Sequence, residues 1–315
     1  MPGSTKIAFT PETFPIDYSS RTLFLGSCFA VNMAAKFDFF AMDHTVNPFG
    51  VLFQPTAIEA LVVRAVNKDY FTEAQIDSNQ DIYFSFLAHS SCSALDKEQV
   101  VVTLNGALDN LAQAIASASH VVLTLGTAWV YRHIATDSLV ANCHKRPNKE
   151  FIKELLTPDQ IAESLDATMS LIRQVNPKAV VILTVSPVRH IKDGVVQNSR
   201  SKAHLLSGIH SLVEPRKRNF YFPAYELLMD ELRDYRYYSS DLIHPNEQAI
   251  DYIWKGFKSA WIGQDALDLQ QEIASLKRAK NHRSLLPGSK ADKEFQELLT
   301  VKILNFNSRF PNIKL

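Results

Sequence analysis

The chain has 315 residues, of which 46% are hydrophobic, enough to bury a full core in one large domain or in one domain with an appendage. Lys and Arg (33) balance Asp and Glu (33), so the composition gives no electrostatic reason to expect nucleic acid or an anionic membrane as a partner. Because we find no secretory signal, no apolar run long enough to span a membrane and only three, widely spaced cysteines, we expect a cytoplasmic protein.

Five apolar runs are predicted as strands of a buried parallel sheet, because they are short and rich in β-branched or aromatic residues. In chain order they are 22–25, 44–49, 121–125, 179–185 and 219–222. A further run, 82–86, is expected in an inserted hairpin. Helices are expected between the strands, mainly where apolar residues recur at helical spacing: 28–37, 104–118, 158–175, 199–213 and a helix starting just after Pro245.

The sequence pattern changes from about Gln264. A charged amphipathic helix is expected over 267–280, a polar connector over 282–290 and a last helix over 292–304. We therefore expect residues 1–263 to form one domain and residues 264–315 to form a helical appendage packed on it.

Strands that alternate with helices of this length predict an α/β protein whose mainly parallel sheet is covered on both faces. Ligands of such sheets bind at the carboxyl ends of the strands. Four segments that carry glycine or polar residues are expected at that edge: 26–27, 47–50, 126–127 and 186–190. Their convergence predicts a site there.

Ser27 is the first candidate for chemistry. It lies where a predicted strand turns into a helix, so N–H groups at the helix N-terminus point at its side chain and can stabilise an oxyanion. The same position also suits a serine that only caps the helix. Asp241 precedes His244 by three residues, a spacing at which the carboxylate can accept Nδ1–H of the imidazole and leave Nε2 free as a general base.

Cys28 is an alternative nucleophile. A helix N-terminus lowers the pKa of a thiol, and Cys28 directly follows Ser27. The first helical turn, however, is expected to direct the Cys28 side chain away from Ser27 and into the core.

The remaining polar candidates carry weaker signals. Cys143 and His144 are neighbours, but no second Cys or His pair has ligand spacing, so no metal is expected. Neither Gly-x-Gly-x-x-Gly nor Gly-x-x-x-x-Gly-Lys-Ser/Thr occurs, and no cofactor is expected. Asn142 and His144 are candidates for a polar substrate pocket. Arg189 and His190 follow a strand end and are candidates for holding a substrate carboxylate or hydroxyl, although a loop pair in water is equally compatible with the pattern.

Several segments together resemble the GSCFA family, which is named for the pentapeptide found at 26–30. The resemblance covers about residues 15–260 and rests on Leu25-Gly-Ser-Cys-Phe-Ala30, Asn47-Pro-Phe-Gly50, Asn142-Cys-His-Lys145, Ser186-Pro-Val-Arg-His190 and Asp241-Leu-Ile-His244-Pro245. It implies membership of the SGNH (GDSL-like) hydrolases and their flavodoxin-like, three-layer α/β/α fold.

The resemblance also implies roles for individual residues. Ser27 would be the nucleophile, His244 the base that takes its proton, and Asp241 the residue that orients His244. The backbone N–H groups of Ser27 and Gly50 would form the oxyanion hole.

One block departs from the pattern of the superfamily. Related hydrolases have Gly-x-Asn-Asp, in which the Asn side chain is a third oxyanion donor, whereas this chain has Gly126-Thr-Ala-Trp129, with Ala128 in the place of the Asn. The loss of one such donor typically costs about 10²–10³ in rate. Thr127, Asn47 and Asn142 are candidates to replace it, and Thr127 is favoured.

These observations predict a serine hydrolase that acts on a small acyl ester. An enzyme that deacetylates or acylates a carbohydrate falls within this prediction. Its expected partner is a small-molecule ester, with no nucleic acid, membrane or cofactor. Two alternatives stay open. The departure at Ala128 allows a binding or scaffold protein with weak or no turnover, and Cys28 allows a thiol-dependent enzyme. The sequence predicts no oligomeric state.

Overall fold

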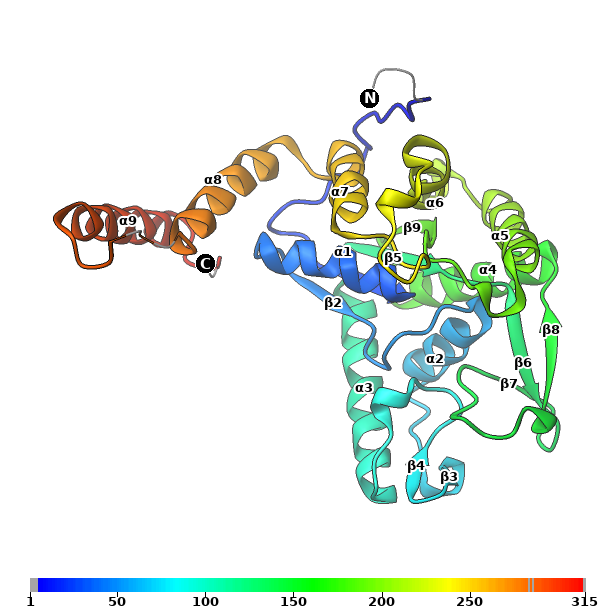
Figure 1. The fold of residues 1–315 in the computed structure, drawn as a ribbon. Helices are drawn as coiled ribbons and strands as arrows, with labels where there is room; N and C mark the ends of the chain where they lie inside the picture. Colours follow the sequence, from blue (N-terminus) through cyan, green and yellow to red (C-terminus); the bar gives the residue numbers. More distant parts are fainter. Residues whose placement is uncertain (1–4, 283, 285, 314–315) are drawn as a thin grey trace.

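A five-stranded sheet forms the centre of the computed structural model, which describes residues 5–282, 284 and 286–313 (Figure 1). Its strands are β1 (Thr22–Gly26), β2 (His44–Val46), β5 (His120–Leu125), β9 (Val180–Val185) and β10 (Asn219–Tyr221). They run parallel in the order β10-β9-β5-β1-β2. Numbered along the chain, this order is 2-1-3-4-5, the flavodoxin-like arrangement. The predicted mainly parallel α/β fold is therefore confirmed.

Successive side chains of each strand point to opposite faces of the sheet and pack into two separate cores. Leu23 and Leu25 of β1 enter one core, and Phe24 enters the other. The first core is closed by α2 (Pro55–Asn67), α3 (Lys97–Ser117), α4 (Pro158–Val175) and α5 (Val195–His210). The second is closed by α1 (Cys28–Phe39) and α7 (Glu247–Trp261). The three-layer α/β/α architecture is confirmed.

Local capping and backbone geometry explain where element boundaries differ from the expected ones. The helix predicted over 104–118 begins at Lys97, because the Asp96 carboxylate accepts the N–H groups of Glu98 and Gln99 and so caps an earlier turn. The strand predicted over 44–49 ends at Val46, because Asn47 takes the left-handed conformation with φ 41°. The helix predicted over 199–213 lies at Val195–His210.

Two antiparallel insertions extend from the α/β body. The hairpin predicted around 82–86 is confirmed as β3 (Asp77–Asn79) paired with β4 (Ile82–Phe84). A second sheet, in the order β7-β6-β8, was not predicted; it comprises β6 (Trp129–His133), β7 (Ser138–Val140) and β8 (Phe151–Leu155). Strands β6 and β8 mix charged and apolar residues, and β7 has only three residues, so none shows the apolar run that marks the central strands.

Short helical turns complete the connections. A one-turn helix α6 (Ala224–Glu226) continues as a π-helical segment η6 (Leu227–Leu232). The 3₁₀ turns are Glu73–Gln75, Ser90–Cys92, Asn148–Glu150, Ile191–Asp193, Pro215–Lys217 and Tyr235–Tyr237.

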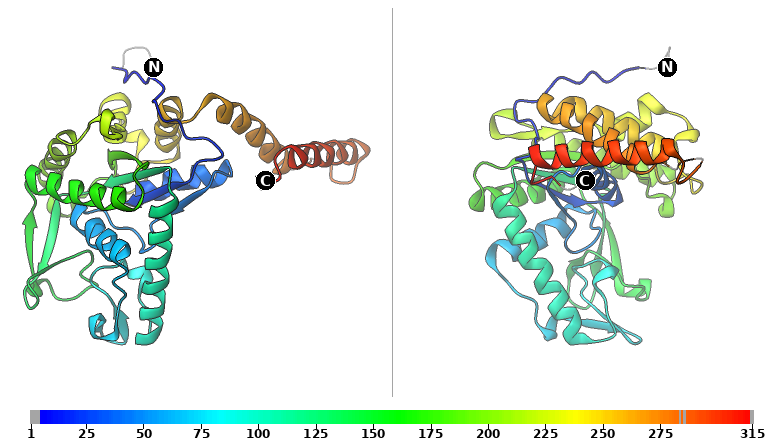
Figure 2. Two further views of the ribbon diagram at one scale, coloured as in Figure 1. Left: turned by 180° about the vertical axis from the view of Figure 1, so that it is seen from behind. Right: turned by 90° about the vertical axis from the view of Figure 1, so that its left-hand side faces the viewer.

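Two C-terminal helices form an arm that projects from the α/β body (Figures 1 and 2). Helix α8 (Gln264–Lys280) follows α7 in the chain. It contacts the end of α1, where Lys277 donates to the carbonyl of Phe39. Helix α9 (Lys290–Arg309) packs on α8 through buried Leu299 and Phe306. The expected helical C-terminal region is present, but residues 283 and 285 of the predicted connector lie outside the described residues. Among the helices described, none combines the length and the apolar character needed to cross a membrane.

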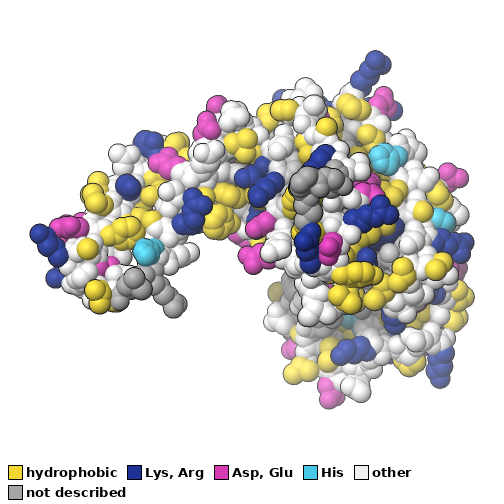
Figure 3. Space-filling model, turned by 45° about the horizontal axis from the view of Figure 1, so that its top comes forward, with side chains coloured by type: hydrophobic (Ala, Val, Ile, Leu, Met, Phe, Trp, Pro, Cys, Tyr) yellow, Lys and Arg dark blue, Asp and Glu magenta, His cyan; other side chains and the backbone are white. Residues whose placement is uncertain are grey.

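The surface agrees with the balanced composition. On the face shown in Figure 3, Lys and Arg side chains lie scattered among Asp and Glu side chains. The exposed side of α9 is more apolar, because Leu298, Val301 and Leu304 are each more than 60% exposed.

Candidate active site

Ser27 occupies the turn between β1 and α1. Its Oγ accepts the N–H of Phe29 at 3.2 Å and thereby caps α1, and the residue is only 2% exposed. The Ser27 hydroxyl still has its own proton to donate, because the bond to Phe29 uses only an oxygen lone pair. The side chain therefore stands at the positive end of the α1 dipole and keeps its own O–H proton.

Asp241 and His244 form the pair that their spacing predicts. Oδ2 of Asp241 lies 2.7 Å from Nδ1 of His244, and Oδ1 accepts the N–H groups of Ile243 at 2.9 Å and His244 at 3.0 Å. The side-chain bond to His244, with these backbone bonds, lowers the pKa of Asp241 to about 2. The carboxylate is thus ionised, fixes the proton on Nδ1 and leaves Nε2 of His244 as an acceptor.

The loop that carries this pair joins the same edge of the sheet as Ser27. The N–H of Arg189, just beyond the carboxyl end of β9, donates to the carbonyl of Ile243 at 3.2 Å. Helix α7, which follows this loop, packs on α1, where Lys36 pairs with Asp251. Within the described residues no hydrogen bond joins Ser27 to His244, and such bonds are often long before a substrate binds.

The two backbone N–H groups expected in the oxyanion hole are both occupied in this structure. The N–H of Ser27 donates to the Thr124 carbonyl at 3.0 Å, and the N–H of Gly50 donates to the Asn47 carbonyl at 2.8 Å. The first bond continues the β1–β5 ladder, and the second closes a tight turn. The expectation that these N–H groups point freely at a substrate is therefore not met.

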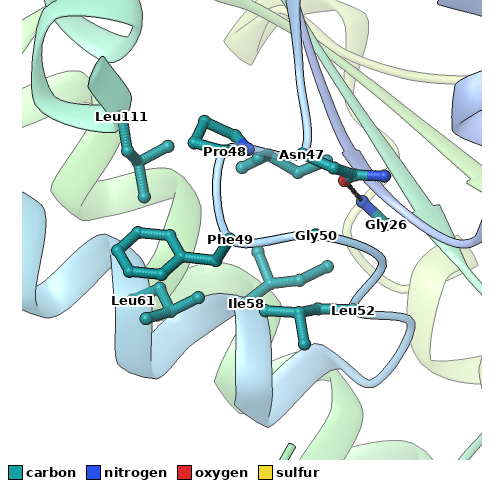
Figure 4. A pocket seen from close by; sticks show the side chains of 10 residues that line it. Gly26, Asn47, Pro48, Phe49, Gly50, Leu52, Ile58, Leu61 and Leu111 are labelled. Atoms are coloured by element: carbon teal, nitrogen blue, oxygen red, sulfur yellow. Dashed lines mark hydrogen bonds between the residues drawn. The ribbon is translucent and has the colours of Figure 1, made fainter. Parts of the chain in front are cut away.

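Asn47 presents a side-chain donor beside the same turn. Its Oδ1 accepts the N–H of Gly26 at 2.8 Å, whereas its buried Nδ2 has no hydrogen-bond partner among the residues that the structure describes. Figure 4 shows the Asn47 amide turned towards Gly26, at the rim of a small cavity lined by apolar side chains such as Phe49 and Leu52. The cavity measures about 20 Å³, room for about one water and too little for an acyl group.

Thr127, the favoured replacement for the absent Asn donor, belongs to a buried network with α5. Its Oγ1 lies 2.9 Å from Oγ of Ser201 and accepts the N–H of Trp129. Ala128 is fully buried and donates its N–H to Ser201 at 2.7 Å. These bonds tie Thr127 and Ala128 to α5 and to the neighbouring backbone.

Arg189 and His190 lie close to the Asp241–His244 loop. The guanidinium of Arg189 stacks on the ring of Tyr238, with 4.2 Å to the ring centroid. The His190 ring packs against Phe53, with 4.9 Å between centroids. Burial, together with the charges of Lys202 and His244, lowers the pKa of His190 to about 4, so this imidazole is neutral at pH 7.

Asn142 and His144 make structural contacts elsewhere. Oδ1 of Asn142 accepts the N–H of His144, and Nε2 of His144 lies 2.9 Å from the carbonyl oxygen of Ser85 and 3.1 Å from that of Ala88. The His144 ring also stacks on Phe84. These bonds brace the loop after β4, and in the described residues none of them reaches Ser27 or His244.

Cys28 differs from expectation in two ways. The residue is exposed instead of entering the core. The surroundings of the thiol desolvate it and raise its pKa, whereas the helix N-terminus was expected to lower it. A raised pKa leaves less thiolate at neutral pH, which disfavours the thiol-dependent alternative.

One buried polar cluster was not predicted. Asn198, Ser201 and Lys202 lie on the inner face of α5 together with Leu205, at helical spacing. The Nζ of Lys202, a residue that is 1% exposed, donates to the carbonyls of Gly126 and Ser186, both at 2.7 Å. It thereby ties the carboxyl ends of β5 and β9 together. The sequence signal for this cluster was that polar residues occupy positions whose helical spacing places them on the buried face of α5.

Lys202 is expected to make stability depend on pH. Burial lowers its pKa from 10.5 to about 7, so between these values the unfolded chain binds one proton more than the folded chain. The free energy of unfolding then rises with pH by up to about 1.4 kcal/mol per unit. Urea unfolding at several pH values between 7 and 10 should show this rise for the wild type relative to Lys202→Met. Parallel profiles for the two proteins would contradict it.

Among the described residues, no three His, Cys, Asp or Glu side chains converge so as to hold a metal ion.

The chain matches one family model and is similar to several solved structures, two of which are described here. The model of the GSCFA family matches residues 21–257, more than half of the chain. No curated protein matches the chain. An acetyl esterase mutant crystallised with acetate ion is similar at 10% identity and a TM-score of 0.38, covering 81% of this chain and 99% of that chain. A carbohydrate esterase family 3 protein from Talaromyces cellulolyticus is similar at 9% identity and a TM-score of 0.36, also covering 81% of this chain and 99% of that chain.

Proposed function

The chain belongs to the GSCFA family, and from this premise we propose that it is a serine hydrolase of small acyl esters. The observation that carries the proposal is the Asp241–His244 pair. An ionised carboxylate holds Nδ1 of an imidazole at 2.7 Å at the sheet edge where Ser27 begins α1. This is the arrangement of base and orienting group that activates a serine. Acetylated carbohydrates are substrates of this chemical class, and acyl transfer to an alcohol would use the same residues.

In the proposed reaction Ser27 Oγ attacks the acyl carbonyl while its proton passes to Nε2 of His244. Asp241 stabilises the resulting imidazolium. The tetrahedral intermediate collapses, the carbon–oxygen bond to the alcohol breaks, and His244 returns the proton to the departing alkoxide. Water, deprotonated by the same imidazole, then attacks the acyl-enzyme and releases the acid and free Ser27.

Asn47 is proposed as a donor to the oxyanion of this intermediate. Its Oδ1 is fixed by the N–H of Gly26, the residue before Ser27, and its Nδ2 is buried without a partner in the described part of the chain. A donor held in place before reaction is what an oxyanion hole requires. Asn47 thus provides a hydrogen-bond donor on the β2 side of Ser27. The N–H groups of Ser27 and Gly50 do not provide one in this structure, because both already donate to backbone carbonyls.

Ester turnover and the variant Asn47→Asp test this proposal together. The wild type is expected to release acid from short-chain esters such as p-nitrophenyl acetate. Asn47→Asp keeps the acceptor for Gly26 but replaces the donor by a carboxylate oxygen, so we expect kcat to fall at least about 10²–10³-fold. Wild-type kcat in the variant would contradict the role of Asn47, and a folded wild type that hydrolyses no ester of an acyl panel would contradict the hydrolase.

A binding protein without turnover is the second candidate. It is favoured by one observation: the N–H groups of Ser27 and Gly50 and the position of Ala128 provide no free oxyanion donor in this structure. A protein of this kind would bind acylated ligands measurably by calorimetry and leave them intact.

A further inference from the structure

The imidazole of His190 is held firmly at the edge of the sheet. The backbone N–H of His190 donates to Oδ1 of Asn198 at 2.9 Å, so α5 fixes this point of the loop after β9. The ring lies against Phe53, and a Cβ added at Gly126 would stand 2.9 Å from its Nε2. The ring therefore fills the space directly beside the end of β5.

Nε2 of His190 is a buried polar atom without a hydrogen-bond partner within residues 5–282, 284 and 286–313. Leaving such a group unpaired costs about 1–3 kcal/mol, so a partner such as a water or a ligand atom is favoured at Nε2. The hydrogen bond between His190 and Asn198 does not offset this cost, because it uses the backbone N–H of His190 and not its ring.

Burial, and to a smaller extent the charge around His190, keeps the ring neutral. Lys202, which donates to the carbonyl of Gly126, and His244 both disfavour a second positive charge on the imidazole. A neutral imidazole carries one N–H donor and one acceptor. In the tautomer with its proton on Nε2, that nitrogen is the donor.

The position of His190 matches the donor that is absent from this chain. Related hydrolases place their third oxyanion donor just after the strand equivalent to β5, where this chain has Ala128 and uses its N–H on Ser201. Nε2 of His190 reaches the end of the same strand from the neighbouring β9 side.

We propose that His190 is a catalytic residue whose Nε2–H donates a hydrogen bond to the developing oxyanion, in place of the Asn that Ala128 replaces. The inference rests on the proposed esterase function. His190 and Asn47 then approach the oxyanion from opposite sides, because β9 and β2 flank the pair β5 and β1 in the sheet. Lys202 and Asn198 serve as positioning residues for this imidazole.

Two substitutions of His190 distinguish a role as a hydrogen-bond donor from a role in packing. His190→Phe keeps an aromatic ring against Phe53 but has no donor, and His190→Gln keeps an N–H group on a side chain of similar reach. We expect kcat for p-nitrophenyl acetate to fall at least about 10²-fold in His190→Phe, with KM changed less than about threefold. His190→Gln should recover at least about tenfold of this loss.

The affinity for a boronic acid is a second measurement, and a loss of packing alone would not change it. A short alkyl boronic acid forms a tetrahedral adduct on an activated serine and places an oxygen in the oxyanion hole. Its affinity should fall in His190→Phe in proportion to kcat. His210→Phe is the matched control, because His210 lies exposed at the end of α5, and it should match the wild type in both measurements.

The outcomes separate this inference from the function on which it rests. A wild type that neither hydrolyses esters nor binds the boronic acid at Ser27 overturns the esterase. An active wild type with unchanged kcat in His190→Phe overturns only the role of His190. Equal losses in His190→Phe and His190→Gln, both with a lowered melting temperature, also overturn it, because they identify a packing role.

Discussion

Replacement of Ser27 by alanine is expected to lower kcat for ester hydrolysis by about 10⁴-fold or more, to the background of the oxyanion donors alone. The substitution removes the nucleophile, so no acyl-enzyme can form. It also removes the cap on α1, since Oγ of Ser27 accepts the N–H of Phe29. A lost cap costs only about 1 kcal/mol, so the variant should fold and its loss of rate should reflect chemistry.

Two companion variants make this result specific. His244→Ala should lose a similar factor, because residues of a triad act as a unit. Cys28→Ala, one residue along the chain, should retain wild-type kcat within about twofold. Loss of activity in Cys28→Ala with full activity in Ser27→Ala would instead support a thiol nucleophile and contradict the serine mechanism.

Replacement of Gly26 by alanine is expected to destabilise the fold by at least about 4 kcal/mol, a large part of an ordinary stability of about 5–15 kcal/mol. Gly26 has φ +138°, a conformation that side chains rarely adopt, and an added Cβ would overlap the Thr124 carbonyl, with its carbon at 2.8 Å. Neither backbone can move away, because Ser27 donates to that same carbonyl within the central sheet. Urea unfolding monitored by circular dichroism measures the effect.

Gly106 supplies the control for Gly26. It lies within α3, and an added Cβ there meets nothing within 4 Å. Gly106→Ala should therefore stabilise the protein by about 0.5–1 kcal/mol, because alanine loses less conformational freedom in a helix. Unfolding of Gly26→Ala within 1 kcal/mol of the wild type would show that the β1–α1 turn is not constrained as the structure indicates.

The sequence predicts the central sheet well because its strands carry their signal locally. Runs such as 121–125 and 179–185 are apolar on both faces, as buried parallel strands must be. The β6–β8 sheet carries no such signal, because Arg132 of β6 pairs with Glu154 of β8 across a surface that charged residues tolerate. Its pairing is decided by contacts that no short window of sequence contains.

The candidate site divides in the same way. The Asp241–His244 bond could be predicted because both partners lie in one turn. The occupied N–H of Ser27 could not, because its acceptor is the carbonyl of Thr124 on a neighbouring strand. The same holds for Lys202, whose two acceptors lie at the ends of β5 and β9 and converge only in the fold. The orientation of Cys28 was predicted wrongly, because the first turn of α1 leaves that side exposed.

Labelling with a fluorophosphonate probe, followed by peptide mass mapping, tests the activated serine most directly. We expect one adduct, on Ser27, in the wild type and its disappearance in a folded His244→Ala variant, because only a serine that can pass its proton to His244 is nucleophilic enough to react. An unlabelled wild type that is folded and monodisperse, or an adduct on Ser27 that persists without His244, would contradict the proposed mechanism.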